Sequence, residues 1–191
     1  MRLILASSSP RRAEILRNAG ISFEAAPAAV DESRWHGETP AHRVRRLASA
    51  KAAAAAGRVS GAAIVLGADT EVVVDGEVLG KPVADLDARE MLRRLSGRVH
   101  EVITGLELIR LPDRATRSEL EVTRVTFAAL SADEINSYVA TGEPFDKAGG
   151  YAIQGRAGRF ITRVEGCYFN VVGLPLSRLC RALLELGWSP D

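Results

Sequence analysis

Apolar and polar residues alternate along the first third of this chain in blocks that predict strands and helices in turn. Short apolar runs at 2–6 and 62–67 have the length and composition of buried strands. Between them, helical spacing covers 10–20 and 39–57, and the second of these opens with a Thr-Pro pair suited to an N-cap and first turn. These patterns predict an α/β arrangement.

The middle of the chain is richer in strand patterns. Residues 71–79 predict a hairpin that turns at Asp75-Gly76. β-branched alternation over 99–111 and 119–130 predicts two antiparallel neighbours, joined through Pro112-Asp113.

Further helices are predicted over 87–95, from a capping box at 131–134, and over 175–186. A polar, glycine-rich loop occupies 142–158. No repeat or low-complexity linker divides the chain, so residues 1–191 predict a single domain. We expect one α/β unit with a mixed, elongated sheet, folded into two lobes around a cleft.

The amino-acid composition excludes several classes of binding partner. Lys and Arg number 25 against 24 Asp and Glu, so non-specific binding to nucleic acid or to an acidic membrane is not expected. The two cysteines, Cys167 and Cys180, form no zinc spacing and are expected to be buried, reduced thiols. The apolar N-terminal run is too short for a signal peptide, and no stretch is long enough to span a bilayer. We therefore expect a cytoplasmic protein.

The first candidate site is the segment Ser7-Ser8-Ser9-Pro10-Arg11-Arg12, between a predicted strand and a predicted helix. Arginines in a first helical turn oppose the positive end of the helix dipole, at a cost of about 0.3–1 kcal/mol each. A bound polyphosphate would reverse that cost, because helix end, hydroxyls and guanidinium groups would all face one anion. The alternative is an ordinary serine-capped helix with solvent-facing arginines.

The second candidate is Lys51, which shares the apolar face of its predicted helix with Val44 and Leu47. Its ammonium group either faces a cleft or reaches solvent, with the aliphatic part of the side chain lying along the edge of the apolar helix face.

Asp69, in Gly67-Ala68-Asp69-Thr70, directly follows the predicted strand 62–67. The carboxyl end of a buried strand is a usual place for ligand chemistry, and a carboxylate there can accept a proton or help to hold Mg²⁺. Its alternative role is that of a turn residue. Lys81 and the pair Asp31-Glu32 are weaker additions to the same site.

The loop 143–155 combines acids, a lysine and several glycines with Gln154, whose amide could recognise a base edge. It could instead be a structural loop that satisfies its own polar groups. Walker A, GxSxG and HExxH patterns are absent from the sequence, and its three histidines are expected to be surface or core residues.

Taken together, these segments resemble the Maf family of nucleotide pyrophosphatases. The resemblance rests on 7–12, on 67–70 with Gly80-Lys81-Pro82, on 95–105, on 143–155 and on the closing 170–175. It spans nearly the whole chain in the expected order. It implies a Maf/Ham1 (ITPase-like) α/β fold, elongated around a central cleft.

The resemblance also implies hydrolysis of a nucleoside triphosphate between its α and β phosphates, with a divalent cation, normally Mg²⁺ and alternatively Mn²⁺. Asp69 matches the proton acceptor and, with Glu32, the metal ligands. The positions that match phosphate, metal or substrate handling are Ser8, Arg11, Arg12, Lys51, Thr70, Lys81 and Gln154. Arg12, Thr70 and Gln154 are similar to the branch that acts on dTTP, UTP and modified pyrimidine nucleotides.

Other functions stay open from the sequence. The same chemistry could act on 7-methyl-GTP or on a non-standard purine triphosphate. The chain could also be a nucleotide-binding regulator of cell division or septum formation. Family similarity is compatible with a homodimer, and neither a nucleic acid nor a membrane is expected as a partner.

Overall fold

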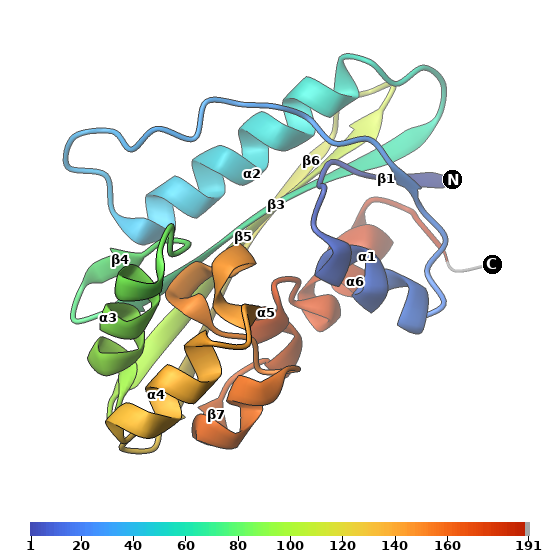
Figure 1. Ribbon diagram of the computed structural model, residues 1–191. Coiled ribbons are helices and arrows are strands. Elements are labelled where there is room, and N and C mark those ends of the chain that lie inside the picture. Colours follow the sequence, from blue (N-terminus) through green and yellow to red (C-terminus); the bar gives the residue numbers. More distant parts are fainter. Residues whose placement is uncertain (190–191) are drawn as a thin grey trace. The chain divides into compact units, whose positions relative to one another are not determined.

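The computed structural model describes residues 1–189, which contain α-helices and the strands of a seven-stranded mixed sheet (Figure 1). The strands are β1 (Arg2–Leu5), β2 (Glu24–Ala25), β3 (Ala63–Val74), β4 (Glu77–Leu79), β5 (Val99–Leu111), β6 (Thr116–Phe127) and β7 (Ile161–Glu165). The α-helices are α1 (Pro10–Asn18), α2 (Pro40–Ala56), α3 (Asp85–Leu95), α4 (Ala132–Val139), α5 (Tyr168–Val172) and α6 (Leu176–Glu185). Three 3₁₀ turns lie at Glu143–Asp146, Ala148–Gly150 and Arg156–Phe160. The sheet order is β2-β1-β3-β5-β6-β7, with β4 paired to β3.

The chain divides into two compact units. Unit 1 contains Met1–Asp69, Thr104–Glu121 and the described residues from Gly173 to 189, and unit 2 contains Thr70–Ile103 and Val122–Val172. The strands β3, β5 and β6 each run from one unit into the other.

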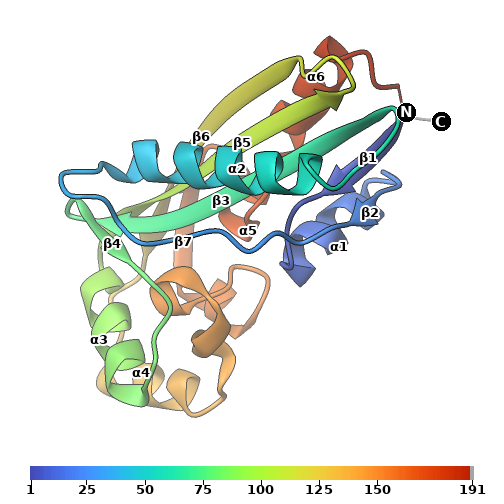
Figure 2. The same ribbon diagram turned by 90° about the horizontal axis from the view of Figure 1, so that it is seen from above.

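In unit 1, β1 pairs in parallel with both β2 and β3, so that Ile4 lies opposite Glu24 on one side and Val65 on the other. The helix α2 covers one face of these strands, and α1 and α6 lie on the other face (Figures 1 and 2). Alanines of α2 pack with Ile4, Val65 and Ile109 in a core that is closed to water. The small alanine side chains let this helix approach the sheet closely.

Unit 2 has its own core, in which strand residues pack against α3 and α4. Its centre is aromatic: the rings of Phe127, Tyr151 and His100 meet edge to face, with centroids 4.9–5.3 Å apart. The strand β7 pairs antiparallel with β6 through a register shift between Thr126 and Phe127.

Several local expectations are confirmed. Thr39 caps α2 by accepting a hydrogen bond from the His42 amide at 3.3 Å. The hairpin turn falls at residues 75–76, between β3 and β4. Ser131 and Glu134 form the reciprocal capping box at the start of α4.

One expectation about the sheet is wrong. The apolar run 62–67 does not end a strand, because β3 continues without a break from Ala63 to Val74. Gly67 is required by packing and not by a turn: a Cβ there would lie 2.1 Å from the backbone oxygen of Ala48 on α2. Asp69 therefore lies within a strand, and its alternative role as a turn residue is excluded.

Smaller differences concern short elements and exposure. The sequence patterns do not predict α5, which has five residues. Cys167 and Cys180 are free, as expected, but only partly buried, and burial raises the pKa of the Cys180 thiol. His100 is buried in the core of unit 2, whereas His36 and His42 are exposed. No helix within residues 1–189 is long and apolar enough to cross a membrane.

Candidate functional site

The serine-rich turn between β1 and α1 forms as a helix cap. Ser9 has extended backbone angles, and its hydroxyl lies 3.5 Å from the Arg12 amide that it caps. Pro10 occupies the first helical position, where its missing N–H is not needed. Ser8 is exposed and Arg11 is half-buried in this turn. The positive end of α1 is thus presented together with a hydroxyl and a guanidinium group.

Arg12 has a different environment from Arg11. It is 8% exposed, and its Nε donates to the carbonyl oxygen of Gly173 at 2.8 Å. Its Nη1 donates to the Ala68 carbonyl at 2.9 Å and to the Ser7 hydroxyl at 3.1 Å. Burial, opposed by the charge of Asp69, lowers the pKa of Arg12 from its ordinary value. Arg12 therefore joins three distant segments of unit 1 around the end of β1.

Lys51 connects the two candidate metal-binding carboxylates. Its Nζ lies 2.7 Å from Asp69 Oδ1 and 2.7 Å from Glu32 Oε1. The side chains of Lys51 and Asp69 are each 13% exposed, whereas that of Glu32 is 57% exposed. The helix α2, the strand β3 and the loop before α2 each supply one member of this group. The sequence-predicted residues Glu32, Lys51 and Asp69 are thus brought together.

Two glycines set the distance between α2 and the strands beneath it. A Cβ at Gly67 would lie 2.1 Å from Ala48 O, and a Cβ at Gly105 would lie 2.6 Å from Val44 O. Both clashes involve helix backbone, which cannot rotate away as a side chain can. Since Lys51 is on α2 and Asp69 is on β3, the spacing at Gly67 also sets their hydrogen-bond distance.

The loop that carries Glu32 is attached to α2 by polar side chains that sequence reasoning did not single out. Glu38 accepts two hydrogen bonds from Arg46, at 2.6 and 2.8 Å, and its pKa is lowered to about 2, mainly by these bonds. A usable signal would have been an acid just before the Thr-Pro helix start with arginines at two positions on the following helix.

The remaining predicted residues lie in unit 2. Thr70 is half-buried, while Lys81 and Gln154 are exposed. The loop that contains Gln154 is built from short 3₁₀ turns and satisfies many of its own polar groups. Glu143 is its anchor, accepting from the Tyr138 hydroxyl at 3.0 Å and from the Arg156 amide at 3.1 Å. This loop therefore holds Gln154 on an ordered backbone with its side chain toward solvent.

The residues of unit 1 fit a hard divalent cation. Glu32 and Asp69 offer carboxylate oxygens on either side of one ammonium group. Within residues 1–189 there is no group of three or more His, Cys, Asp and Glu side chains placed to hold a metal. Mg²⁺ usually binds one or two carboxylates and completes its shell with water and substrate phosphates, so a donor pair suffices.

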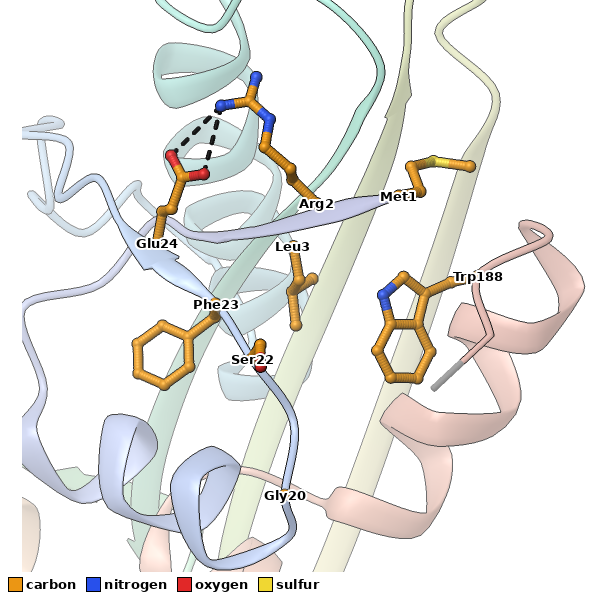
Figure 3. A pocket seen from close by; sticks show the side chains of 8 residues that line it. All are labelled: Met1, Arg2, Leu3, Gly20, Ser22, Phe23, Glu24 and Trp188. Atoms are coloured by element: carbon orange, nitrogen blue, oxygen red, sulfur yellow. Dashed lines mark hydrogen bonds and ion pairs between the residues drawn. The ribbon is translucent and has the colours of Figure 1, made fainter. Parts of the chain in front are cut away.

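A separate surface pocket lies at the opposite end of β1 from the serine turn. Figure 3 shows the Arg2–Glu24 ion pair on one side of it and the Trp188 indole on the other. The remaining lining residues are Met1, Leu3, Gly20, Ser22 and Phe23. None of the predicted site residues lines this pocket, and we assign it no ligand.

Comparisons with a family model and with individual proteins point to the same family. Residues 2–186 match the family described as Maf-like protein. The chain is 55% identical to the dTTP/UTP pyrophosphatase of Symbiobacterium thermophilum, over 97% of this chain and 94% of that protein. It is 50% identical to the dTTP/UTP pyrophosphatase of Pelotomaculum thermopropionicum, over 98% and 97% of the two chains.

Solved structures extend the similarity to the fold. The Ham1 protein of Staphylococcus aureus aligns with a TM-score of 0.53 at 16% identity, over 98% of this chain and 100% of that chain. A HAM1 protein from Coxiella burnetii aligns with a TM-score of 0.54 at 18% identity, over 97% and 99%. At these identities the likeness concerns the fold alone, and it agrees with the Maf/Ham1 arrangement predicted from the sequence.

Proposed function

The chain belongs to the family of Maf-like proteins, and from this membership we propose that it hydrolyses dTTP and UTP to the nucleoside monophosphate and pyrophosphate. The observation that carries the proposal is the group formed by Glu32, Lys51 and Asp69, with Nζ–O distances of 2.7 Å. It supports the proposal because two carboxylates, groups able to accept a proton or hold a metal, lie beside one ammonium group. Relatives named dTTP/UTP pyrophosphatase, which are 50–55% identical over nearly the full length, support the choice of dTTP and UTP as substrates.

Phosphate binding is assigned to the serine turn and to nearby cations. The Ser8 hydroxyl, the Arg11 guanidinium group and the positive end of α1 would contact the triphosphate. Lys51 would add a point charge. Lys81, an exposed residue of unit 2, stays a proposed substrate-binding residue on the resemblance alone. Arg12 would support this region by holding the turn to Ala68 and Gly173 through its hydrogen bonds.

Asp69 is proposed as the base. Its Oδ1 accepts a hydrogen bond from Lys51 Nζ at 2.7 Å. Oδ2 would accept a proton from water as the water oxygen forms a bond to phosphorus. The bond between the α and β phosphates then breaks, and its electron pair leaves with pyrophosphate. Because Lys51 holds Oδ1, the carboxylate keeps one orientation during this step.

A divalent cation, which we propose to be Mg²⁺ with Mn²⁺ as a substitute, would be held by Glu32 and Asp69 together with substrate oxygens. When bound, it supplies charge neutralisation for the phosphates and the leaving group. Thr70 and Gln154, both in unit 2, stay proposed substrate-binding residues on the resemblance alone, and the Gln154 amide can both donate to and accept from a base edge.

The proposal is tested by measuring pyrophosphate release from dTTP, UTP, CTP, GTP and 7-methyl-GTP, with and without Mg²⁺. Products are separated so that pyrophosphate is distinguished from orthophosphate. We expect Mg²⁺-dependent pyrophosphate from dTTP and UTP, and a loss of about 10²-fold or more in Asp69→Asn.

The matched control is Asp133→Asn, the same change at an exposed position of α4. It should keep wild-type turnover. Orthophosphate as the main product, a clear preference for 7-methyl-GTP, or wild-type activity in Asp69→Asn would each contradict a part of the proposal. Binding of dTTP without any turnover would support a nucleotide-binding regulator instead.

A further inference from the structure

We propose that Glu38 is a positioning residue, which holds the loop before α2 so that the Glu32 carboxylate lies beside Lys51 and Asp69. This inference rests on the proposed function, because it assigns Glu38 a role through a proposed metal ligand. Glu38 itself does not contact Lys51 or Asp69; it acts through Arg46 and the loop backbone.

Glu38 is a buried carboxylate with an unusually full set of partners. Its side chain is 1% exposed, and Arg46 binds both of its oxygens, Nε to Oε1 at 2.6 Å and Nη2 to Oε2 at 2.8 Å. The Trp35 amide donates to Oε2 at 3.3 Å, and His42 Nδ1 lies 3.1 Å from Oε1. A two-point arginine–carboxylate pair fixes both orientation and distance. The pair therefore fastens the end of the loop to α2.

The same helix holds the backbone of the loop next to Glu32. Arg46 Nη2 also donates to the Ser33 carbonyl at 3.0 Å, and Arg43 Nη2 donates to the Glu32 carbonyl at 2.7 Å. These bonds fix consecutive peptide units, including that of Glu32 itself. The Glu32 side chain is more than half exposed and makes its 2.7 Å contact with Lys51 from this fixed backbone. Without the attachment, an exposed side chain on a loop without regular structure would sample many positions.

Burying a carboxylate is unfavourable unless it is paired with a cation. An apolar contact could attach the loop to the helix equally well, so attachment alone does not explain the Glu38–Arg46 pair. What an arginine–carboxylate pair adds is direction, because Arg46 can hold Glu38 and the Ser33 carbonyl at the same time only in one geometry. Partners of metal ligands commonly act in this way, and their loss lowers metal affinity or activity by about 10- to 100-fold.

The central test is a double-mutant cycle with Glu38→Gln and Glu32→Gln, measured as pyrophosphate release from dTTP over a Mg²⁺ titration. Glu38→Gln should raise the Mg²⁺ concentration for half-maximal rate by about tenfold or more. In a Glu32→Gln background the same change should have almost no further effect, because the residue through which Glu38 acts is already removed.

A readout without metal or substrate comes from Trp35. Arg46 Cζ lies 4.2 Å from the centre of the Trp35 ring, and the chain has two tryptophans in all, so Trp188→Phe leaves Trp35 as the one tryptophan. In that background, Glu38→Gln should shift the Trp35 emission and increase its quenching by acrylamide. The melting temperature, followed by circular dichroism, reports whether the variant is folded.

The matched control is Glu24→Gln, which removes another arginine–carboxylate pair of unit 1 at an exposed place (Figure 3). It should change neither the Mg²⁺ titration nor the Trp35 emission. Additive effects of Glu38→Gln and Glu32→Gln, or an unchanged Mg²⁺ titration in folded Glu38→Gln, would overturn the inference while leaving the proposed function intact. A wild-type protein without pyrophosphatase activity would instead refute the proposed function, and the Trp35 measurement would still decide whether Glu38 holds the loop.

Discussion

Replacing Gly67 by alanine tests whether the spacing between α2 and β3 sets the geometry of the Lys51–Asp69 pair. The added Cβ would lie 2.1 Å from Ala48 O and 2.7 Å from Ala52 N. The shorter distance is at least 1.3 Å less than the 3.4–4 Å of an ordinary contact, and both partners are backbone atoms. The helix must therefore move away from the strand by a comparable distance.

Two consequences follow from that displacement. Overpacking of this kind costs about 1–3 kcal/mol of folding free energy, so the melting temperature should fall. The Lys51–Asp69 bond, 2.7 Å long, should lengthen beyond hydrogen-bonding distance. Since a misplacement of about 1 Å can reduce catalysis by ~10²-fold, we expect kcat/KM for dTTP to fall by about that factor in protein that is still folded.

Two controls separate a local displacement from general destabilisation. Gly57→Ala should keep activity and stability, because the added Cβ would lie 3.8 Å from its neighbours at the end of the same helix. Gly105→Ala should destabilise in a similar way, since its Cβ would lie 2.6 Å from Val44 O. Because Val44 is two turns from Lys51, activity should fall less. Wild-type activity in Gly67→Ala, or equal activity losses in Gly67→Ala and Gly105→Ala, would refute the reasoning.

Three further outcomes are expected. Burial lowers the pKa of His100 from 6.5 to about 4. The stability contributed by a neutral His100 is therefore complete above pH 6.5 and falls by about 3 kcal/mol as the pH drops toward 4. Denaturant titrations at pH 7.5 and 5 should show this loss of stability in the wild type and a smaller loss in His100→Gln. Arg11→Lys keeps the charge but loses the planar fork, so kcat/KM should drop by about tenfold, and full activity in this variant would argue against two-point phosphate binding. Gly155→Ala would bring a Cβ to 2.2 Å from Glu143 Oε1 and displace the carboxylate that anchors the loop of Gln154, so the preference for UTP over CTP should weaken while Mg²⁺ dependence is kept.

Much of the fold could be predicted because helix starts and turns have local chemical signals. Thr39 with Pro40, and Ser131 with Glu134, are short-range signals that the structure confirms. The break expected after Gly67 failed because a glycine that admits a neighbouring helix cannot be distinguished locally from one that ends a strand.

The candidate site was only partly predictable, because some of its contacts leave no local signal in the sequence. Lys51 stood out because a charge on an apolar helix face needs a partner, and the structure supplies Asp69 and Glu32. Glu38 did not stand out, because an acid near a helix start is an ordinary surface feature in a sequence. Its burial and its two-point contact with Arg46 depend on the path of the loop, which no periodic pattern encodes.

The hydrogen bond from Arg12 to the Gly173 carbonyl joins residues 161 positions apart in the chain, and it has a consequence for biosynthesis. During translation, Lys51 and Asp69 leave the ribosome long before the acceptor that completes the surroundings of Arg12. The serine turn cannot reach its final form until residue 173 has been made. A nascent chain that stops before Gly173 would therefore carry the serine turn, the proposed phosphate-binding segment, without the hydrogen bond that completes the surroundings of Arg12.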